Sequence, residues 1–167
     1  GLNHFLPPDI RILKAENVKN DFHARFSAHE KTYCYCIYEC PFDRAAYLNR
    51  AARVSEKLDV KAMRMASRAF LGEHDFTSFM STGADTVSAV RNVKDVHVVR
   101  SGGLVRIFVT ANGFLYNMVR LIAGVLVRAG QGKIDKAGVE KLIALKNKHA
   151  VREVMPAEGL YLVSVKY

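Results

Sequence analysis

The stretch VRNVKDVHVVRSGGLVRIFVTANGFLYNMVRLIAGVLVRAG, residues 90–130, decides the fold. It begins with two runs rich in Val and Ile, residues 90–100 and 104–111, joined through a Gly pair that can supply the positive φ of a tight turn. From residue 111 to residue 130, apolar residues recur at three- and four-residue spacing, which predicts a helix. The stretch therefore predicts a β-hairpin followed directly by a helix.

One cation interrupts the apolar helix. Arg120 lies opposite the main apolar stripe, and its neighbours on that second face are small or apolar. A guanidinium does not lose its proton, so a buried Arg120 requires a fixed anion, whereas an exposed Arg120 needs only water. The pattern alone leaves both environments open.

The rest of the chain predicts further strands and helices around this unit. We expect strands at residues 10–13, 30–38 and 159–167, helices at 60–72 and 135–147, and a loop or short helix at 41–59. The resulting order, β-β-α-β-β-α-α-β, is typical of the α+β class. We expect a largely antiparallel mixed sheet with helices packed on one face.

Composition indicates one globular domain with an anionic partner. The chain has 167 residues, of which 50% are hydrophobic, and we expect a single domain spanning 1–167. It has 25 Lys and Arg against 16 Asp and Glu, giving a net charge of +9. Such an excess favours nucleic acid as the partner, although an ordinary solvated basic surface is the alternative.

Three closely spaced cysteines, Cys34, Cys36 and Cys40, are a poor basis for a disulfide framework because their number is odd. They favour a reducing compartment, and the sequence has no zinc-finger spacing and no apolar run near the roughly 20 residues of a membrane span. We therefore expect a cytoplasmic protein without a metal site.

Two other kinds of site receive little support. His74 and Asp75 are adjacent, as in some metal phosphohydrolases, but no other His or Asp has ligand-like spacing, so a turn at a helix end is the favoured interpretation. An RNA-recognition motif would need an aromatic spacing that residues 106–114 lack.

Several segments together resemble the tRNA pseudouridine synthases of the TruA type. In the family's order they are DFHARFSA (21–28), KTYCYCIY (31–38), FLGEHDFTSF (70–79), VRNV (90–93), the helix stretch 111–130 and PAEGLYLVSVKY (156–167). The resemblance covers nearly the whole chain. It implies an isomerase that converts uridine to pseudouridine in the anticodon stem-loop of tRNA, without metal or organic cofactor, as a homodimer.

The resemblance also implies the site residues. The tyrosine that stacks on the base and takes part in proton transfer corresponds to Tyr33, and the arginine that pairs with the catalytic aspartate corresponds to Arg120. For contacts with the substrate RNA we expect a further set of basic and apolar residues: Arg25, Lys31, Arg91, Phe114 and Met118.

The family's catalytic aspartate lies in a Gly-Arg-Thr-Asp motif, and this sequence contains no such motif. We therefore expect the chain to be the C-terminal half of the catalytic domain, inactive by itself. The alternative is an RNA-binding module of the same fold with no catalytic activity.

Overall fold

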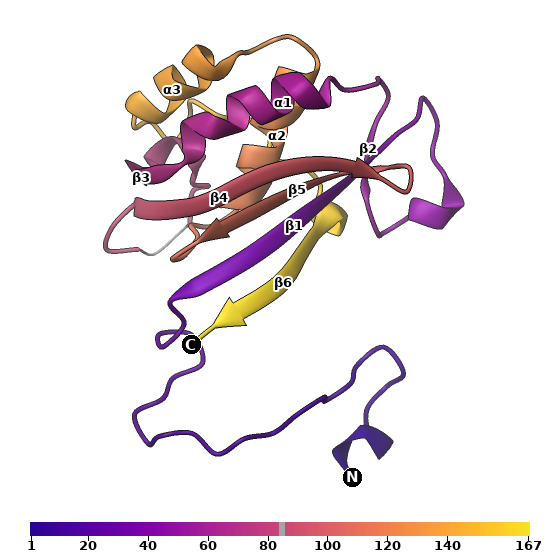
Figure 1. Ribbon diagram of the computed structural model, residues 1–167, viewed down its shortest axis with the longest axis vertical. Helices are drawn as coiled ribbons and strands as arrows, with labels where there is room; N and C mark the ends of the chain where they lie inside the picture. Colours follow the sequence, from indigo (N-terminus) through magenta and orange to yellow (C-terminus); the bar gives the residue numbers. More distant parts are fainter. Residues whose placement is uncertain (84–85) are drawn as a thin grey trace.

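The computed structural model describes residues 1–83 and 86–167, which form a six-stranded sheet covered by helices on one face (Figure 1). The strands are β1 (Glu30–Glu39), β2 (Ala52–Val54), β3 (Gly72–Asp75), β4 (Val90–Ser101), β5 (Leu104–Ala111) and β6 (Leu160–Lys166). Their order is β2-β1-β5-β4-β3, with β6 also paired to β1. Only β1 and β2 pair in parallel within the described chain, so the largely antiparallel α+β fold is confirmed.

In the described part of the chain, three α-helices pack against the sheet: α1 (Val60–Ser67), α2 (Met118–Gly130) and α3 (Lys136–Ala144). Asp59 caps α1 by accepting hydrogen bonds from the backbone amides of Lys61 and Ala62, and Asp135 caps α3 through the amide of Gly138. Both carboxylates satisfy donors that a helix start leaves free. The hairpin β4–β5 is confirmed, and so is a helix after it, although this helix begins at Met118 and not at residue 111.

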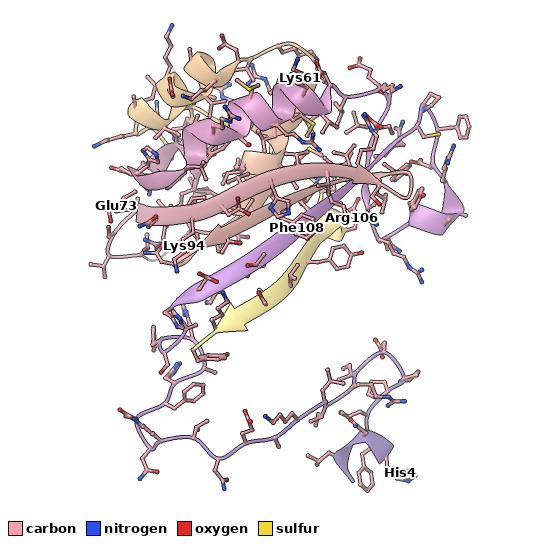
Figure 2. All side chains as sticks on the ribbon, in the orientation of Figure 1. His4, Lys61, Glu73, Lys94, Arg106 and Phe108 are labelled. Atoms are coloured by element: carbon pink, nitrogen blue, oxygen red, sulfur yellow. The ribbon has the colours of Figure 1, made fainter. Side chains whose placement is uncertain are left out.

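Alternation along β1 divides its side chains between two clusters. Tyr35 and Ile37 are fully buried in the main core beneath the helices. Cys34, Cys36 and Tyr38 face the other way and form a smaller cluster against which Phe108 packs. Figure 2 shows Phe108 and its neighbour Arg106 on the sheet face away from the helices. All three cysteines are buried and free, without a disulfide.

The strand predicted at residues 10–13 is wrong. This segment belongs to an extended N-terminal arm that runs outside the sheet (Figure 1). The Asn3 side chain hydrogen-bonds both the amide and the carbonyl of Ile12, at 2.8 Å each, in place of a neighbouring strand. An apolar alternating pattern becomes a strand only where a partner supplies the ladder.

The region after α1 also differs from prediction. The helix ends at Ser67, a 3-10 turn covers Arg68–Phe70, and Gly72 adopts φ +95° at the start of β3. His74 and Asp75 therefore belong to a strand paired with β4, not to a turn at a helix end. Before α1, residues 41–59 were expected to form a loop or short helix, and they contain a short 3-10 helix, Ala45–Tyr47, together with the unpredicted strand β2.

The second face of α2 is covered by protein. Gly124 packs so closely that a Cβ there would lie 2.6 Å from the carbonyl oxygen of Glu153, and Val127 on the same face is buried. The segment 151–156 thus occupies the side from which Arg120 projects, as the bond from Arg120 to Met155 confirms. Among the described residues, no helix is long and apolar enough to cross a membrane.

Candidate active site

A pocket of about 520 Å³ opens where the N-terminal part of β1 meets the start of α2 and the loop before β4. Its volume lies in the range of small-molecule sites in proteins. The structure brings five of the seven predicted site residues to its walls: Arg25, Tyr33, Arg91, Phe114 and Met118. They come from segments far apart in the sequence.

Tyr33 and Phe114 form an aromatic wall of the pocket, which Tyr116 also lines. Their rings meet edge to face, with centroids 5.0 Å apart and planes at 89°. Tyr33 is half-buried, and its hydroxyl has no hydrogen-bond partner in the part of the chain that the structure describes. The pocket therefore offers an aromatic ring with an available hydroxyl.

Tyr35, two residues along the same strand, has a different environment. It is fully buried, and its hydroxyl donates a 2.6 Å hydrogen bond to the carbonyl oxygen of Pro156. Burial, with the nearby charge of Glu158, raises the pKa of the Tyr35 hydroxyl above its ordinary range. The Tyr35 hydroxyl already bonds the backbone, whereas the Tyr33 hydroxyl has no described partner, so the two tyrosines of the Tyr-x-Tyr pair are not equivalent.

Two guanidinium groups line the pocket. Arg91 donates to the carbonyl oxygens of Ser88 and Val90 at 2.8 and 2.6 Å, and burial lowers the pKa of Arg91. The Arg25 guanidinium lies 5.5 Å from the centre of the Phe26 ring. Neither makes an ion pair with a described residue, so the rim of the pocket carries uncompensated positive charge.

Arg120 is not among the residues that line the pocket, but its side chain contacts Asn117, which is. Its Nε donates to the carbonyl oxygen of Met155 at 2.6 Å, and its Nη1 donates to Oδ1 of Asn117 at 3.0 Å. Within residues 1–83 and 86–167 it has no carboxylate partner, and its Nη2 makes no hydrogen bond and is not buried. Neutral acceptors thus hold the guanidinium while its charge stays available to an anion.

Lys31 is the second predicted site residue that does not line the pocket in the described part of the chain. Several other lining residues were not predicted from the sequence, including Thr86, Tyr116, Asn117 and Leu160. Leu160 and Asn117 each lie in a segment that resembles the family, so their position in those segments was the available signal. Thr86 lies in a loop without periodicity, which offered none.

The described residues contain no group of three or more His, Cys, Asp or Glu side chains arranged to hold a metal ion. Nε2 of His74 lies 2.9 Å from the carbonyl oxygen of Leu71, and Asp75 accepts hydrogen bonds from the amide and hydroxyl of Thr77. Asp75 also forms an ion pair with Lys146 at 3.6 Å, so both side chains already have protein partners.

Comparison with known proteins agrees with the fold. A sequence model described as tRNA pseudouridine synthase matches residues 66–167. The chain is 42% identical over 167 residues to tRNA pseudouridine synthase A of Acetivibrio thermocellus, covering 100% of this chain and 68% of that protein. The same-named proteins of Ruminiclostridium cellulolyticum and Bacillus licheniformis are each 42% identical, with 69% and 68% of their lengths covered.

The sheet, its one-sided helices and the basic aromatic pocket thus occur in a chain related to RNA-modifying isomerases throughout its length. This chain belongs to the tRNA pseudouridine synthase family, and its relatives named above are A-type members.

Proposed function

We propose that this chain forms one side of the catalytic site of an enzyme that isomerises uridine to pseudouridine in the anticodon stem-loop of tRNA. The observation that carries the proposal is the environment of Arg120, which two neutral acceptors orient and no described carboxylate neutralises. The attacking carboxylate would come from an aspartate outside the 167 residues, because the Gly-Arg-Thr-Asp motif is absent from them. Arg120 would hold that carboxylate ionised and correctly oriented.

The reaction breaks the glycosidic bond between the ribose C1′ and the base N1, and then forms a bond between C1′ and C5 of the same base. A proton leaves C5, and N1 gains one, so the isomerisation is balanced without a redox partner. The base must be held while it is detached and turned. Stacking on an aromatic side chain contributes about 1–3 kcal/mol per base, and Tyr33 with Phe114 offers such a platform.

Tyr33 would also take part in proton transfer. Its hydroxyl lies at the pocket wall and has no partner among the described residues, so it can form a hydrogen bond with a bound base. Met118 would pack against the base from the start of α2. The neighbouring Tyr35 cannot serve in the same way because its hydroxyl is bonded to the backbone.

RNA binding would depend on positive charge around this pocket. Arg25 and Arg91 line it, and Lys31 lies on β1 two residues before Tyr33. A uridine in a stem-loop must be turned out of its stack at a cost of a few kcal/mol, and phosphate contacts can offset that cost. The net charge of +9 supports such contacts.

We also propose the domain organisation, the oligomeric state and the cellular location of the enzyme. Residues 1–167 would act as one domain, the C-terminal half of the catalytic domain, in a cytoplasmic homodimer. The resemblance of the segments from residue 21 to residue 167 supports this part, together with the match over 100% of the chain.

A second candidate is an RNA-binding module without activity of its own. The same observation favours it for the isolated chain, since Arg120 has no carboxylate in the described residues. The two candidates differ in what happens when the missing carboxylate is supplied.

The test compares the 167-residue chain with a longer enzyme in which the same chain follows a segment carrying Gly-Arg-Thr-Asp. Each is incubated with a tRNA transcript, and pseudouridine is mapped by nucleotide. A transcript with cytidine in place of the anticodon-arm uridines is the control. We expect conversion in that arm by the longer enzyme and none by the chain alone. Conversion by the chain alone would contradict the proposal that the attacking carboxylate lies outside the 167 residues. If neither protein converted uridine, the RNA-binding module would be the function.

A further inference from the structure

Asn117 stands at the position that caps the N-terminus of α2, yet it does not act as a cap. A capping asparagine has an extended backbone and accepts a hydrogen bond from an amide in the first turn. Here φ is +60° and ψ is 9°, in the left-handed region, and the side chain makes no capping bond. Asparagine tolerates this conformation better than most residues, and glycine better still. The amide must therefore be explained by its other contacts.

Those contacts join Arg120 to the loop before β4. Oδ1 of Asn117 accepts a 3.0 Å hydrogen bond from Nη1 of Arg120, and its Nδ2 donates a 3.0 Å hydrogen bond to Oγ of Ser81. A guanidinium can only donate, so the oxygen of the amide must face Arg120 and the nitrogen must face the serine. The backbone amide of Ser81 also donates to the carbonyl oxygen of Tyr116, which holds the loop in place.

The second fixed point of the guanidinium is the carbonyl of Met155, which accepts from Nε of Arg120 at 2.6 Å. With Nε and Nη1 both held, the guanidinium plane cannot turn about its last bonds without breaking a hydrogen bond. Nη2 is then the nitrogen left for another partner. Both acceptors are neutral, so they orient the cation without cancelling its charge.

We infer that Asn117 is a positioning residue for Arg120. Its amide sets the rotation of the guanidinium so that Nη2 points toward the carboxylate required by the proposed function, on which this inference rests. The left-handed backbone at Asn117 brings the side chain back over the first turn of α2, where Arg120 lies. Asn117 itself lines the pocket, so a displaced amide would also alter the wall next to the base.

The test uses the longer enzyme with the Gly-Arg-Thr-Asp segment and the variant Asn117→Gly. Glycine keeps the left-handed backbone at no steric cost but removes both hydrogen bonds of the amide. If Asn117 served only the turn, this variant would have wild-type activity. We expect kcat to fall by about 10-fold to 100-fold, as for a misplaced catalytic group, with KM for tRNA changed by less than about 2-fold.

A second variant distinguishes orientation from charge. Asn117→Asp keeps the shape and the contact with Arg120 but adds a negative charge that competes with the catalytic carboxylate. We expect it to lower kcat more than Asn117→Gly while the melting temperature stays near that of the wild type. The matched control is Asn49→Gly, which replaces another left-handed asparagine (φ +58°) that does not line the pocket and should keep kcat within about 2-fold.

Side-chain NMR of the arginines gives a readout that does not depend on turnover. In the wild type, the Nη resonances of Arg120 should be distinct because rotation is hindered, and in Asn117→Gly they should average. Full kcat, or unchanged resonances, in Asn117→Gly would overturn the inference while the proposed function stood. An inactive wild-type enzyme would instead overturn the proposed function and this inference with it.

Discussion

Replacing Arg120 in the 167-residue chain measures how firmly this residue is held before any carboxylate is present. The side chain makes two hydrogen bonds, to Met155 and to Asn117. Arg120→Met removes both, and Arg120→Lys keeps a charge that can reach only one acceptor at a time. Both variants should therefore lower the free energy of unfolding, and the methionine variant should lower it more.

The magnitude follows from the number of bonds and their exposure. A hydrogen bond to a charged group contributes about 1.5–3 kcal/mol, and the lower end applies because Arg120 is only half-buried. We expect a loss of about 1.5 kcal/mol for Arg120→Lys and about 3 kcal/mol for Arg120→Met. In a domain of this size, each kcal/mol lowers the melting temperature by about 2–4 °C.

Urea denaturation followed by circular dichroism measures these losses directly. The control is Arg128→Met on the same helix, whose side chain makes no hydrogen bond with the described residues and should cost at most about 1 kcal/mol through the helix dipole. If Arg120→Met were as stable as the wild type within about 0.5 kcal/mol, the two acceptors would not hold the guanidinium. The account of a preoriented Arg120 would then fail.

Three further predictions concern the tyrosines, salt and pH. In the longer enzyme, Tyr33→Phe should keep tRNA affinity but lower single-turnover conversion by about 100-fold, because proton transfer needs the hydroxyl. Tyr35→Phe should mainly lower thermal stability, because it removes the hydrogen bond to Pro156. Equal losses of turnover in the two variants would contradict the assignment of proton transfer to Tyr33. The affinity of the chain for tRNA should fall with salt at a log–log slope steeper than about −1, and a flat dependence would exclude phosphate contacts as the main attraction. Hydrogen bonds from Lys166 and Lys94 lower the pKa of Glu30 from 4.5 to about 2, so this carboxylate stabilises the fold above pH 4.5 and the contribution is lost as pH falls toward 2. In Glu30→Gln, the free energy of unfolding measured with urea should depend less on pH between 2 and 4.5 than in the wild type. An unchanged pH dependence would show that the ion pairs of Glu30 do not stabilise the fold.

The parts of the fold that could be predicted are those with a strong local pattern. The strands β4 and β5, with a Gly pair between them, and the helix α2 each have an apolar repeat long enough to predict their type of secondary structure. The segment 10–13 has a strand-like pattern but no neighbour, so it stays outside the sheet. The strands β2 and β3 have three and four residues, too few for a pattern to appear.

The site was predictable to the extent that it depends on motifs. Tyr33, Phe114 and Arg91 could be proposed for one site from their segments, and the structure places all three at one pocket. The acceptors of Arg120 could not be found in this way. Met155 lies 35 residues farther along the chain, in a segment without periodicity, and its contribution is a backbone carbonyl.

The left-handed conformation of Asn117 could not be predicted from the sequence either. Asparagine before a helix suggests an ordinary cap, and only tertiary contacts with Ser81 and Arg120 direct its side chain elsewhere. Sequence patterns report local preference and burial, whereas the orientation of a guanidinium depends on groups that the fold brings together.

The most direct test of the central claim is the structure of the longer enzyme, with the Gly-Arg-Thr-Asp segment included. The quantity to measure is the distance from Nη2 of Arg120 to the nearest oxygen of that aspartate. We expect a charge-assisted hydrogen bond of about 2.7–2.9 Å, with the bonds to Met155 and Asn117 retained. An aspartate that lies beyond ion-pair distance, with Nη2 still facing water, would contradict the claim that this chain supplies the arginine of a shared catalytic site.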